Sequence, residues 1–448
     1  MSTLPDDTKR FLHRTALGQQ RDGRVPGLST AVSRGGELLW FAGIGTGEVG
    51  SKQTPGPDDQ YLIASITKTF TAVMVMQLRD EGRLSLDDLL GDHLSDVPHP
   101  VTVRQALAHV SGMQREPVGD VWDTLQQPDA SSLMRGFAEV ERVGRPHTRW
   151  HYSNVVFAVL GQVLEQLDGR PWAEAVQARL LRPLGMTRTS VGFDDGGHVT
   201  GYFVPPFSDV PRPEPVIAMK AMTAVGGLAS TARDLARWSA FVASPDPAVL
   251  SPDTLEEMCQ PQALLYSDNW TAAMGLGFFL HRTESGRTWV GHSGGLPGYV
   301  TGLLTHRETG TGGITMMNNT AAPDPTALAI QLADRVVDDL PVDDEPWRPG
   351  TTVPEELAGI IGRWYSEGQG FTFSVREGRL EARMDAASRT KAPSVFAAEG
   401  PDRYRTESGR ERGELLRVTR DDTGRVDRLH WATYLFTREP LGFGEHLD

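Results

Sequence analysis

The fold is best predicted from the segment Ser65-Ile-Thr-Lys-Thr-Phe-Thr-Ala-Val-Met-Val-Met-Gln-Leu78. It is apolar on nearly every face from Phe70 onward, which predicts a helix buried in the core. Residues three apart on a helix are surface neighbours, so the Lys68 amine is within reach of the Ser65 hydroxyl. The segment therefore places a hydroxyl and an amine together at the start of a buried helix.

A lysine in apolar surroundings loses its proton more easily than one in water, because desolvation disfavours the ammonium. A neutral amine beside a serine hydroxyl is a general base beside a nucleophile. Ser65 also opens the predicted helix, where backbone N–H groups and the helix dipole favour developing negative charge. The alternative is that the Lys68 side chain only extends from a core helix toward solvent.

The Ser-x-x-Lys pattern occurs a second time, at Ser388–Lys391. That copy lies in the polar stretch Ala-Ala-Ser-Arg-Thr-Lys-Ala-Pro, which predicts a solvated surface loop. The chain has five lysines: Lys9, Lys52, Lys68, Lys220 and Lys391. Of these, only Lys68 lies within an apolar helical segment. Because burying a lysine is costly unless the protein uses it, the first pair is the candidate site.

Two further motifs place polar side chains at the ends of predicted elements. Tyr152-Ser-Asn154 precedes an apolar helix predicted from Val155 to Leu167, so its polar residues could simply cap that helix. His292-Ser-Gly-Gly295 ends a predicted strand in a glycine-rich turn, and Val300–Thr305 forms the next strand. Glycines in such a turn let a ligand approach the backbone closely, although an ordinary hairpin has the same composition.

The order Ser-x-x-Lys, Tyr-Ser-Asn, His-Ser-Gly resembles the serine β-lactamase and penicillin-binding-protein superfamily, in particular its class C β-lactamase-like branch, peptidase family S12. Further segments agree with this family: Pro26–Leu39, Val101–Gly112, Arg182–Met186 and Gly226–Thr231. The resemblance implies an α+β fold over residues 1–340, in which helices flank an antiparallel sheet that adjoins an all-helical lobe.

The resemblance also implies a role for each matched residue. Ser65 would be the nucleophile that accepts the acyl group. Lys68 and Tyr152 would share the general-base and general-acid steps, with the phenolate form of Tyr152 favoured by nearby cationic or hydrogen-bonding groups. Asn154 would hold Lys68 and a substrate amide. This scheme requires no cofactor and no metal.

The His292 motif would supply the other half of the site. The backbone N–H groups of Ser65 and Gly295 would form the oxyanion hole, and Ser293 and Gly294 would bind substrate beside it. β-Lactamases and D,D-peptidases usually carry a lysine where this chain has His292. Since histidine is largely uncharged at pH 7, recognition of a penicillin carboxylate is not expected. Histidine at this place is more similar to D-aminopeptidases, esterases and stand-alone peptide cyclases.

Composition limits the classes of partner. The net charge of −14 and the absence of a basic block argue against nucleic-acid binding. The opening residues contain no apolar signal-peptide core, and no apolar run is long enough to span a membrane. The single cysteine, Cys259, excludes an intramolecular disulfide. These features predict a cytoplasmic enzyme whose partners are small-molecule or peptide substrates.

A second domain is predicted after a proline-rich acidic linker at 341–353. Residues 354–448 contain short alternating strands, which predict an antiparallel barrel or sandwich. Its Gly-x-Trp-Tyr start is similar to the lipocalin-like domain attached to several family members. In peptide-cyclising relatives an arginine near the chain end helps to position substrate, which makes Arg438 a candidate substrate-binding residue. The alternative is an ordinary surface arginine.

The leading hypothesis is an acyl-transfer enzyme that forms an ester on Ser65 from an ester, thioester or amide. D-amino-acid-containing peptides are the substrate class that the resemblance implies, with release by hydrolysis or aminolysis. One alternative is a penicillin-binding-protein-type thioesterase that cyclises nonribosomal peptides from a carrier protein. Another is a catalytically silent scaffold on the same fold.

Overall fold

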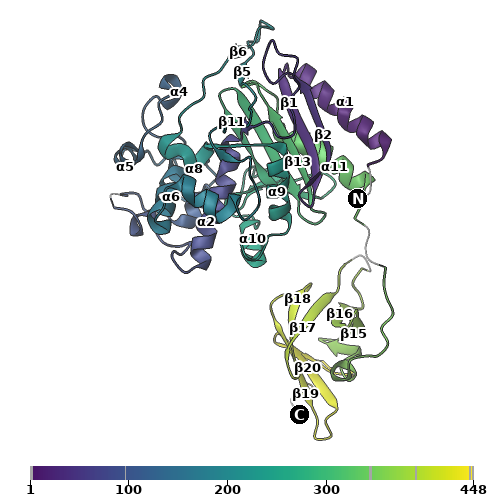
Figure 1. Cartoon of the computed structure of the whole chain (residues 1–448). Coiled ribbons are helices and arrows are strands. Elements are labelled where there is room, and N and C mark those ends of the chain that lie inside the picture. The colour runs from purple at the N-terminus through teal and green to yellow at the C-terminus, as the bar shows by residue number, and fades with distance from the viewer. Residues whose placement is uncertain (1–3, 96, 343–345, 389–390, 443–444, 446–448) are drawn as a thin grey trace. The chain divides into compact units, whose positions relative to one another are not determined.

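The computed structural model describes residues 4–95, 97–342, 346–388, 391–442 and 445. The chain divides into two compact units, Met1–Val342 and Asp343–Asp448 (Figure 1). This division falls within the linker predicted at 341–353, of which residues 343–345 lie outside the described residues. The domain bounds 1–340 and 354–448 remain predictions.

An eight-stranded antiparallel sheet forms the centre of the first unit. Its strand order is β2-β1-β13-β12-β11-β10-β9-β8. The strands are β1 (Gly27–Arg34), β2 (Glu37–Gly45), β8 (Ala263–Leu264), β9 (Ala272–Met274), β10 (Phe279–Arg282), β11 (Thr288–Leu296), β12 (Tyr299–His306) and β13 (Thr311–Met317). β10 pairs with β11 only as far as Gly291, so the end of β11 that carries His292 to Gly295 has no neighbour on that side among the described strands.

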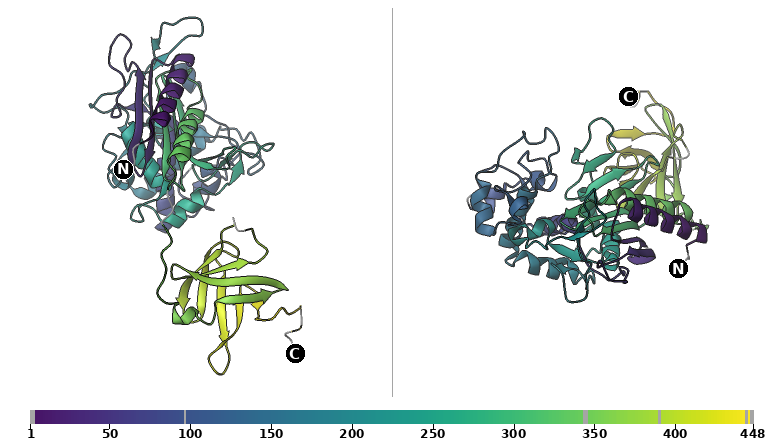
Figure 2. Two further views of the ribbon diagram at one scale, coloured as in Figure 1. Left: turned by 90° about the vertical axis from the view of Figure 1, so that its right-hand side faces the viewer. Right: turned by 90° about the horizontal axis from the view of Figure 1, so that it is seen from above.

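Helices cover both faces of this sheet, as the predicted fold requires. α1 (Asp6–Asp22) and α11 (Pro325–Asp339) pack together on one face of the sheet (Figure 2). Leu12 and Leu332 of these helices join the apolar side chains of β1. α9 (Ala232–Ala243) covers the other face with Trp238. The amphipathic pattern of these helices explains the arrangement, because each buries its apolar stripe against the sheet.

The helical lobe continues the core on the α9 side of the sheet. Its centre is α2 (Thr67–Asp80), buried from Thr67 to Leu78 as its apolar run predicts, and α6 (Asn154–Asp168) packs beside it. The remaining helices of this unit are α3 (Val103–Leu107), α4 (Val121–Thr124), α5 (Ala130–Phe137), α7 (Trp172–Val176), α8 (Thr223–Gly226) and α10 (Pro252–Met258). Among the described residues, no helix combines the length and the apolar character needed to cross a bilayer.

Short strands brace the connections between these elements. β3 (Tyr61–Leu62), β7 (Leu228–Ser230) and β4 (Ser190–Val191) form a three-stranded sheet, while β5 (Tyr202–Phe203) and β6 (Arg212–Pro213) form a hairpin. β3 leads directly into the turn at Ala64–Ile66 from which α2 starts. The pairing of β3 with β7 therefore fixes where α2 begins.

The second unit is a nearly closed antiparallel barrel of eight strands in sequence order, as predicted. The strands are β14 (Gly362–Ser366), β15 (Gln369–Arg376), β16 (Arg379–Met384), β17 (Ser394–Gly400), β18 (Arg403–Ser408), β19 (Leu415–Arg420), β20 (Val426–Trp431) and β21 (Tyr434–Phe436). The first and last strands meet through paired backbone bonds between Tyr365 and Thr437, of 2.8 and 3.0 Å. Aromatic side chains, including Trp364, Phe373 and Trp431, fill the interior.

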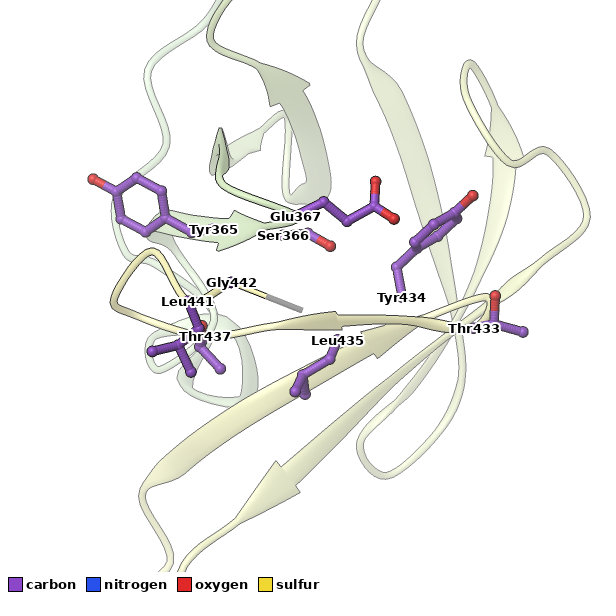
Figure 3. A pocket seen from close by; sticks show the side chains of 9 residues that line it. All are labelled: Tyr365, Ser366, Glu367, Thr433, Tyr434, Leu435, Thr437, Leu441 and Gly442. Carbon is purple, nitrogen blue, oxygen red and sulfur yellow. The ribbon is translucent and has the colours of Figure 1, made fainter. Parts of the chain in front are cut away.

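β17 begins directly after Pro393. A turn at Ala432, with φ of +54°, separates β20 from β21. A cavity of about 300 Å³ lies beside the Tyr365–Thr437 closure, between the end of β14 and β21 (Figure 3).

Candidate active site

Ser65 and Lys68 meet where the turn at Ala64–Ile66 runs into α2. Lys68 Nζ lies 3.0 Å from Ser65 Oγ, and it also donates to the carbonyl of Val225 at 3.0 Å. The Lys68 side chain is fully buried, whereas Ser65 is half-buried and lines a cavity. The predicted pair is therefore brought together, with its amine inside the protein and its hydroxyl facing outward.

The surroundings of Lys68 favour the neutral amine. Burial holds the pKa of Lys68 well below its usual value, the charge of Glu116 opposes this shift, and that of Arg115 adds to it. The amine lies 5.0 Å from the ring centre of Tyr152 and 5.9 Å from that of Phe157. Since one N–H of the neutral amine is held by Val225, its lone pair is free to accept the proton of Ser65.

Tyr152 lies in the same cluster, but its expected phenolate form is not supported. Burial raises the pKa of Tyr152, and the hydrogen bond to Ser65 and the charge of Arg115 only partly oppose the rise. The nearest positive group, Arg115, stacks over the ring at 4.9 Å and is not bonded to the phenol oxygen. The predicted effects of a hydrogen bond and a nearby cation are both present and lower the pKa of Tyr152, but desolvation outweighs them, so the net shift favours the neutral phenol.

Asn154 has a different partner from the one predicted. Its side-chain Nδ2 donates to Glu116 at 2.7 Å, and no bond joins it to Lys68. The carbonyl of Arg115 accepts the backbone N–H groups of Asn154 and Val155, at 2.7 and 3.1 Å. This contact caps the start of α6 and brings Glu116 beside Asn154. Ser153 caps the same helix through Val156 N–H, as the sequence predicts.

His292 is buried on β11 and is uncharged. Its Nδ1 donates to the carbonyl of Ser293, and burial lowers the pKa of His292 to about 3. The ring packs against Phe279, with 4.5 Å between ring centres. With the proton on Nδ1, Nε2 is a hydrogen-bond acceptor. This agrees with the prediction that His292 carries no charge for a substrate carboxylate.

The glycines after His292 let β11 approach the nucleophile. A Cβ on Gly294 would lie 2.3 Å from the carbonyl oxygen of Ile63, two residues before Ser65. A Cβ on Gly295 would meet no atom within 4 Å. Gly294 is therefore required for close packing, and Gly295 and Ser293 line the cavity next to Ser65.

The cavity at Ser65 has a volume of about 410 Å³. Its wall contains every predicted site residue of the first unit except the buried Lys68, together with five residues that sequence reasoning did not assign: Arg115, Glu116, Trp122, Trp150 and Phe279. No local pattern marks Glu116, because it reaches the site only through the contact of its loop with α6. The cavity in the barrel (Figure 3) contains no Ser–Lys pair in its wall, so the candidate site is the one at Ser65.

Arg438 lies in the second unit, where its guanidinium holds the barrel together. It donates to the carbonyls of Arg363, Gly359 and Ile361 at 2.8–3.2 Å. It also stacks on Trp364, 3.7 Å from the ring centre. These contacts give Arg438 a structural role within the barrel, and a role in substrate binding stays a prediction.

Comparison with known proteins decides the family. The model of the Beta-lactamase family matches residues 12–337, and that of a domain of unknown function, DUF7586, matches residues 353–438. The chain belongs to the Beta-lactamase family. Beta-lactamase-like protein 2 of Dictyostelium discoideum is 28% identical over 306 residues, which cover 64% of this chain and 55% of that protein. Unguisins hydrolase ungD' of Aspergillus campestris is 25% identical over 358 residues, or 71% and 63% of the two chains. The matches thus span less than two thirds of these relatives.

Solved structures agree with this assignment. A D-stereospecific amidohydrolase from Streptomyces sp. is 26% identical with a TM-score of 0.62, and the match covers 72% of this chain and 98% of that one. SurE is 24% identical with a TM-score of 0.60 over 97% of this chain and 98% of its own. The second likeness concerns the fold alone and includes the part of this chain that forms the barrel.

Proposed function

We propose that this chain is a serine acyl-transfer enzyme in which Ser65 attacks an ester, thioester or amide carbonyl. The observation that carries the proposal is the fully buried Lys68 amine 3.0 Å from Ser65 Oγ. Burial keeps that amine unprotonated, so it can take the serine proton as the Oγ–carbon bond forms. A positioned base of this kind typically accelerates a reaction by about 10²–10⁴-fold.

The remaining protons can be followed through the same cluster. The backbone N–H groups of Ser65 and Gly295 would stabilise the oxyanion, for which one donor is typically worth about 2.7–4 kcal/mol. The neutral phenol of Tyr152 gives its proton to the leaving group as the carbon–heteroatom bond breaks, and regains a proton from the Lys68 ammonium. Water or an amine then attacks the ester on Ser65 by the reverse steps.

The polar groups of the cavity support substrates that present N–H groups. Three buried atoms of its wall have no hydrogen-bond partner among the described residues: Asn154 Oδ1, His292 Nε2 and Trp150 Nε1. The first two are acceptors, and the carboxylate of Glu116 lies beside Asn154. The guanidinium of Arg115 in the same wall pairs with Glu116, with 3.4 Å between Nε and the carboxylate oxygen. The unpaired acceptors therefore suit the amide and amine groups of a peptide better than the carboxylate of a penicillin. Similarity to a D-stereospecific amidohydrolase supports peptides with D-residues as the acyl donor.

A short-chain p-nitrophenyl ester and a β-lactam chromophore test this proposal together. We expect turnover of the ester, a mass increase equal to one acyl group on Ser65, and much slower turnover of the β-lactam. Absence of both ester turnover and acylation of Ser65 would support the silent scaffold instead. Comparable turnover of the β-lactam would contradict the substrate class.

A peptidyl thioester with a C-terminal D-residue distinguishes the two modes of release. Hydrolysis gives the linear acid, whereas head-to-tail cyclisation gives a product lighter by one water, so product mass decides between them. We expect the linear acid, and a cyclic product would support the thioesterase alternative. The cytoplasmic location also stays a prediction, to be checked by fractionating cells that express the native gene.

A further inference from the structure

His109 lies next to the site without lining its cavity. It follows α3 in the left-handed region, with φ of +55°, and its side chain is 1% exposed. The sequence predicts only a helix-capping role for it. Glycine, and less often asparagine, is the usual residue at this position after a helix.

Both residues that flank Tyr152 are bound to His109. The His109 carbonyl accepts the backbone N–H of His151 at 2.9 Å. Its ring Nδ1 accepts the backbone N–H of Ser153 at 3.1 Å. A backbone N–H can only donate, so Nδ1 is unprotonated and the ring proton lies on Nε2. Burial holds the pKa of His109 well below its usual value, so this acceptor persists at neutral pH.

Tyr152 lies between these two bonded residues, and the His109 ring stacks on the face of its phenol ring. The two ring centres are 4.2 Å apart, with 25° between the planes. The His109 ring also stacks on Phe157, with 5.1 Å between the ring centres. The rings of Phe157 and Tyr152 both lie beside the Lys68 amine. Tyr152 is thus held at three points by one residue, through the backbone on either side and through its ring.

We infer that His109 is a positioning residue that fixes the phenol of Tyr152 against Ser65 and Lys68. It touches no substrate and transfers no proton, so it acts only through Tyr152. The inference rests on the proposed function, because a fixed phenol matters only if Tyr152 transfers a proton. A small displacement of a catalytic group is known to lower a rate by as much as about 10²-fold.

The test is a double-mutant cycle with the substitutions His109→Asn and Tyr152→Phe. Asparagine tolerates positive φ and its Oδ1 can replace Nδ1 as acceptor, but it removes the ring stack. We expect His109→Asn to lower kcat for the ester by about tenfold with KM within about twofold. In the Tyr152→Phe background, the same change should have no further effect. An equal loss in both backgrounds would overturn the inference.

His99→Asn is the matched control. His99 is a partly buried histidine of the same unit that packs edge-on against Phe137 at 5.3 Å and contacts its carbonyl. It lies away from the Ser65 cavity, so kcat should not change. A loss equal to that of His109→Asn would mean that any buried histidine matters, and would overturn the inference.

A second measurement does not depend on turnover. With 3-fluorotyrosine placed only at position 152, the ¹⁹F spectrum of the full chain should give one narrow line, and His109→Asn should broaden or shift it. An unchanged line would overturn the inference even if the enzyme is active. A changed line in a chain without ester turnover would uphold the positioning of Tyr152 and reject only the proposed function.

Discussion

The chain contains the same Ser-x-x-Lys spacing in two places with opposite surroundings. At Ser65–Lys68 the lysine is fully buried and its amine meets the serine hydroxyl. At Ser388–Lys391 both residues are exposed, and the backbone N–H of Lys391 donates to the carbonyl of Ser388. Residues 389–390 between them lie outside the described residues.

The difference shows that spacing alone does not make this chemistry. The apolar run of α2 removes the first lysine from water, and desolvation then turns an ordinary ammonium into a candidate base. In the barrel, the first described element after the second serine is the strand β17 and not an apolar helix. The sequence expectation of a solvated surface for the second pair is confirmed. Each prediction below changes one side of this comparison.

Removing the nucleophile should have the largest effect. We expect Ser65→Ala to lower kcat/KM for the ester by roughly 10³–10⁶-fold, because, among the described residues, Ser65 is the one side chain hydrogen-bonded to the Lys68 amine. Ester kinetics and intact-protein mass after incubation with substrate measure this. Full acylation of the Ser65→Ala variant would show that another residue is the nucleophile.

Replacing the amine should have the second-largest effect. We expect Lys68→Met to lower kcat/KM for the ester by about 10²–10⁴-fold. In the native enzyme, kcat/KM should rise with pH through the lowered pKa of Lys68, and the residual rate of Lys68→Met should lack this rise. A pH profile identical in the two proteins would contradict the assignment of the base.

The same variant should change how stability depends on pH. Between the lowered folded pKa of Lys68 and its usual value near 10.5, the unfolded chain binds a proton that the folded chain does not. The free energy of unfolding of the native protein should therefore rise with pH across that window, relative to Lys68→Met. Urea titrations of both proteins at several pH values measure the difference. If the difference in the free energy of unfolding between the two proteins does not change with pH, the pKa of Lys68 is not lowered by folding.

The approach of β11 to the nucleophile can be changed without touching the Ser–Lys pair. A methyl group at Gly294 would meet the carbonyl of Ile63, so Gly294→Ala should displace the strand and lower kcat by about 10²-fold. Gly295→Ala is the matched control, since its Cβ meets open space, and it should stay within a few-fold of the native rate. Equal losses in both variants would contradict this account of the glycines.

The smallest effects are expected at the second pair. Ser388→Ala and Lys391→Met should leave ester turnover unchanged and alter the free energy of unfolding by no more than about 0.5 kcal/mol, as is usual for surface substitutions. Thermal unfolding and ester kinetics measure both quantities. A large loss of turnover in either variant would show that the exposed Ser388–Lys391 pair also contributes to catalysis, and would contradict the comparison of the two pairs.

Local patterns were sufficient for much of this structure. The buried α2 and the Ser153 cap of α6 follow from apolar periodicity and capping residues, which are properties of neighbouring positions. The sheet-and-helix architecture was predicted from the family resemblance and not from these patterns. The family resemblance placed Tyr152 and His292 beside Ser65, and both line its cavity.

What the sequence did not reveal depends on contacts between distant segments. Glu116 meets Asn154 because a loop carbonyl caps α6, and nothing in the residues around position 116 indicates that contact. The neutral state of Tyr152 depends on how deeply the phenol is buried, which packing decides rather than the nearby charges. The residues around His109 predict only a helix cap, and the stacking of its ring on Tyr152 is visible only in the structure.

The charge on the Lys68 amine is the central claim, and ¹⁵N NMR of the lysine Nζ atoms measures it directly. With five lysines in the chain, the signal of Lys68 can be assigned by its loss in Lys68→Met. The account predicts that at pH 7 this nitrogen has the chemical shift of a neutral amine while the other four have that of an ammonium. Five ammonium signals at pH 7, with Lys68 titrating near 10.5, would contradict it.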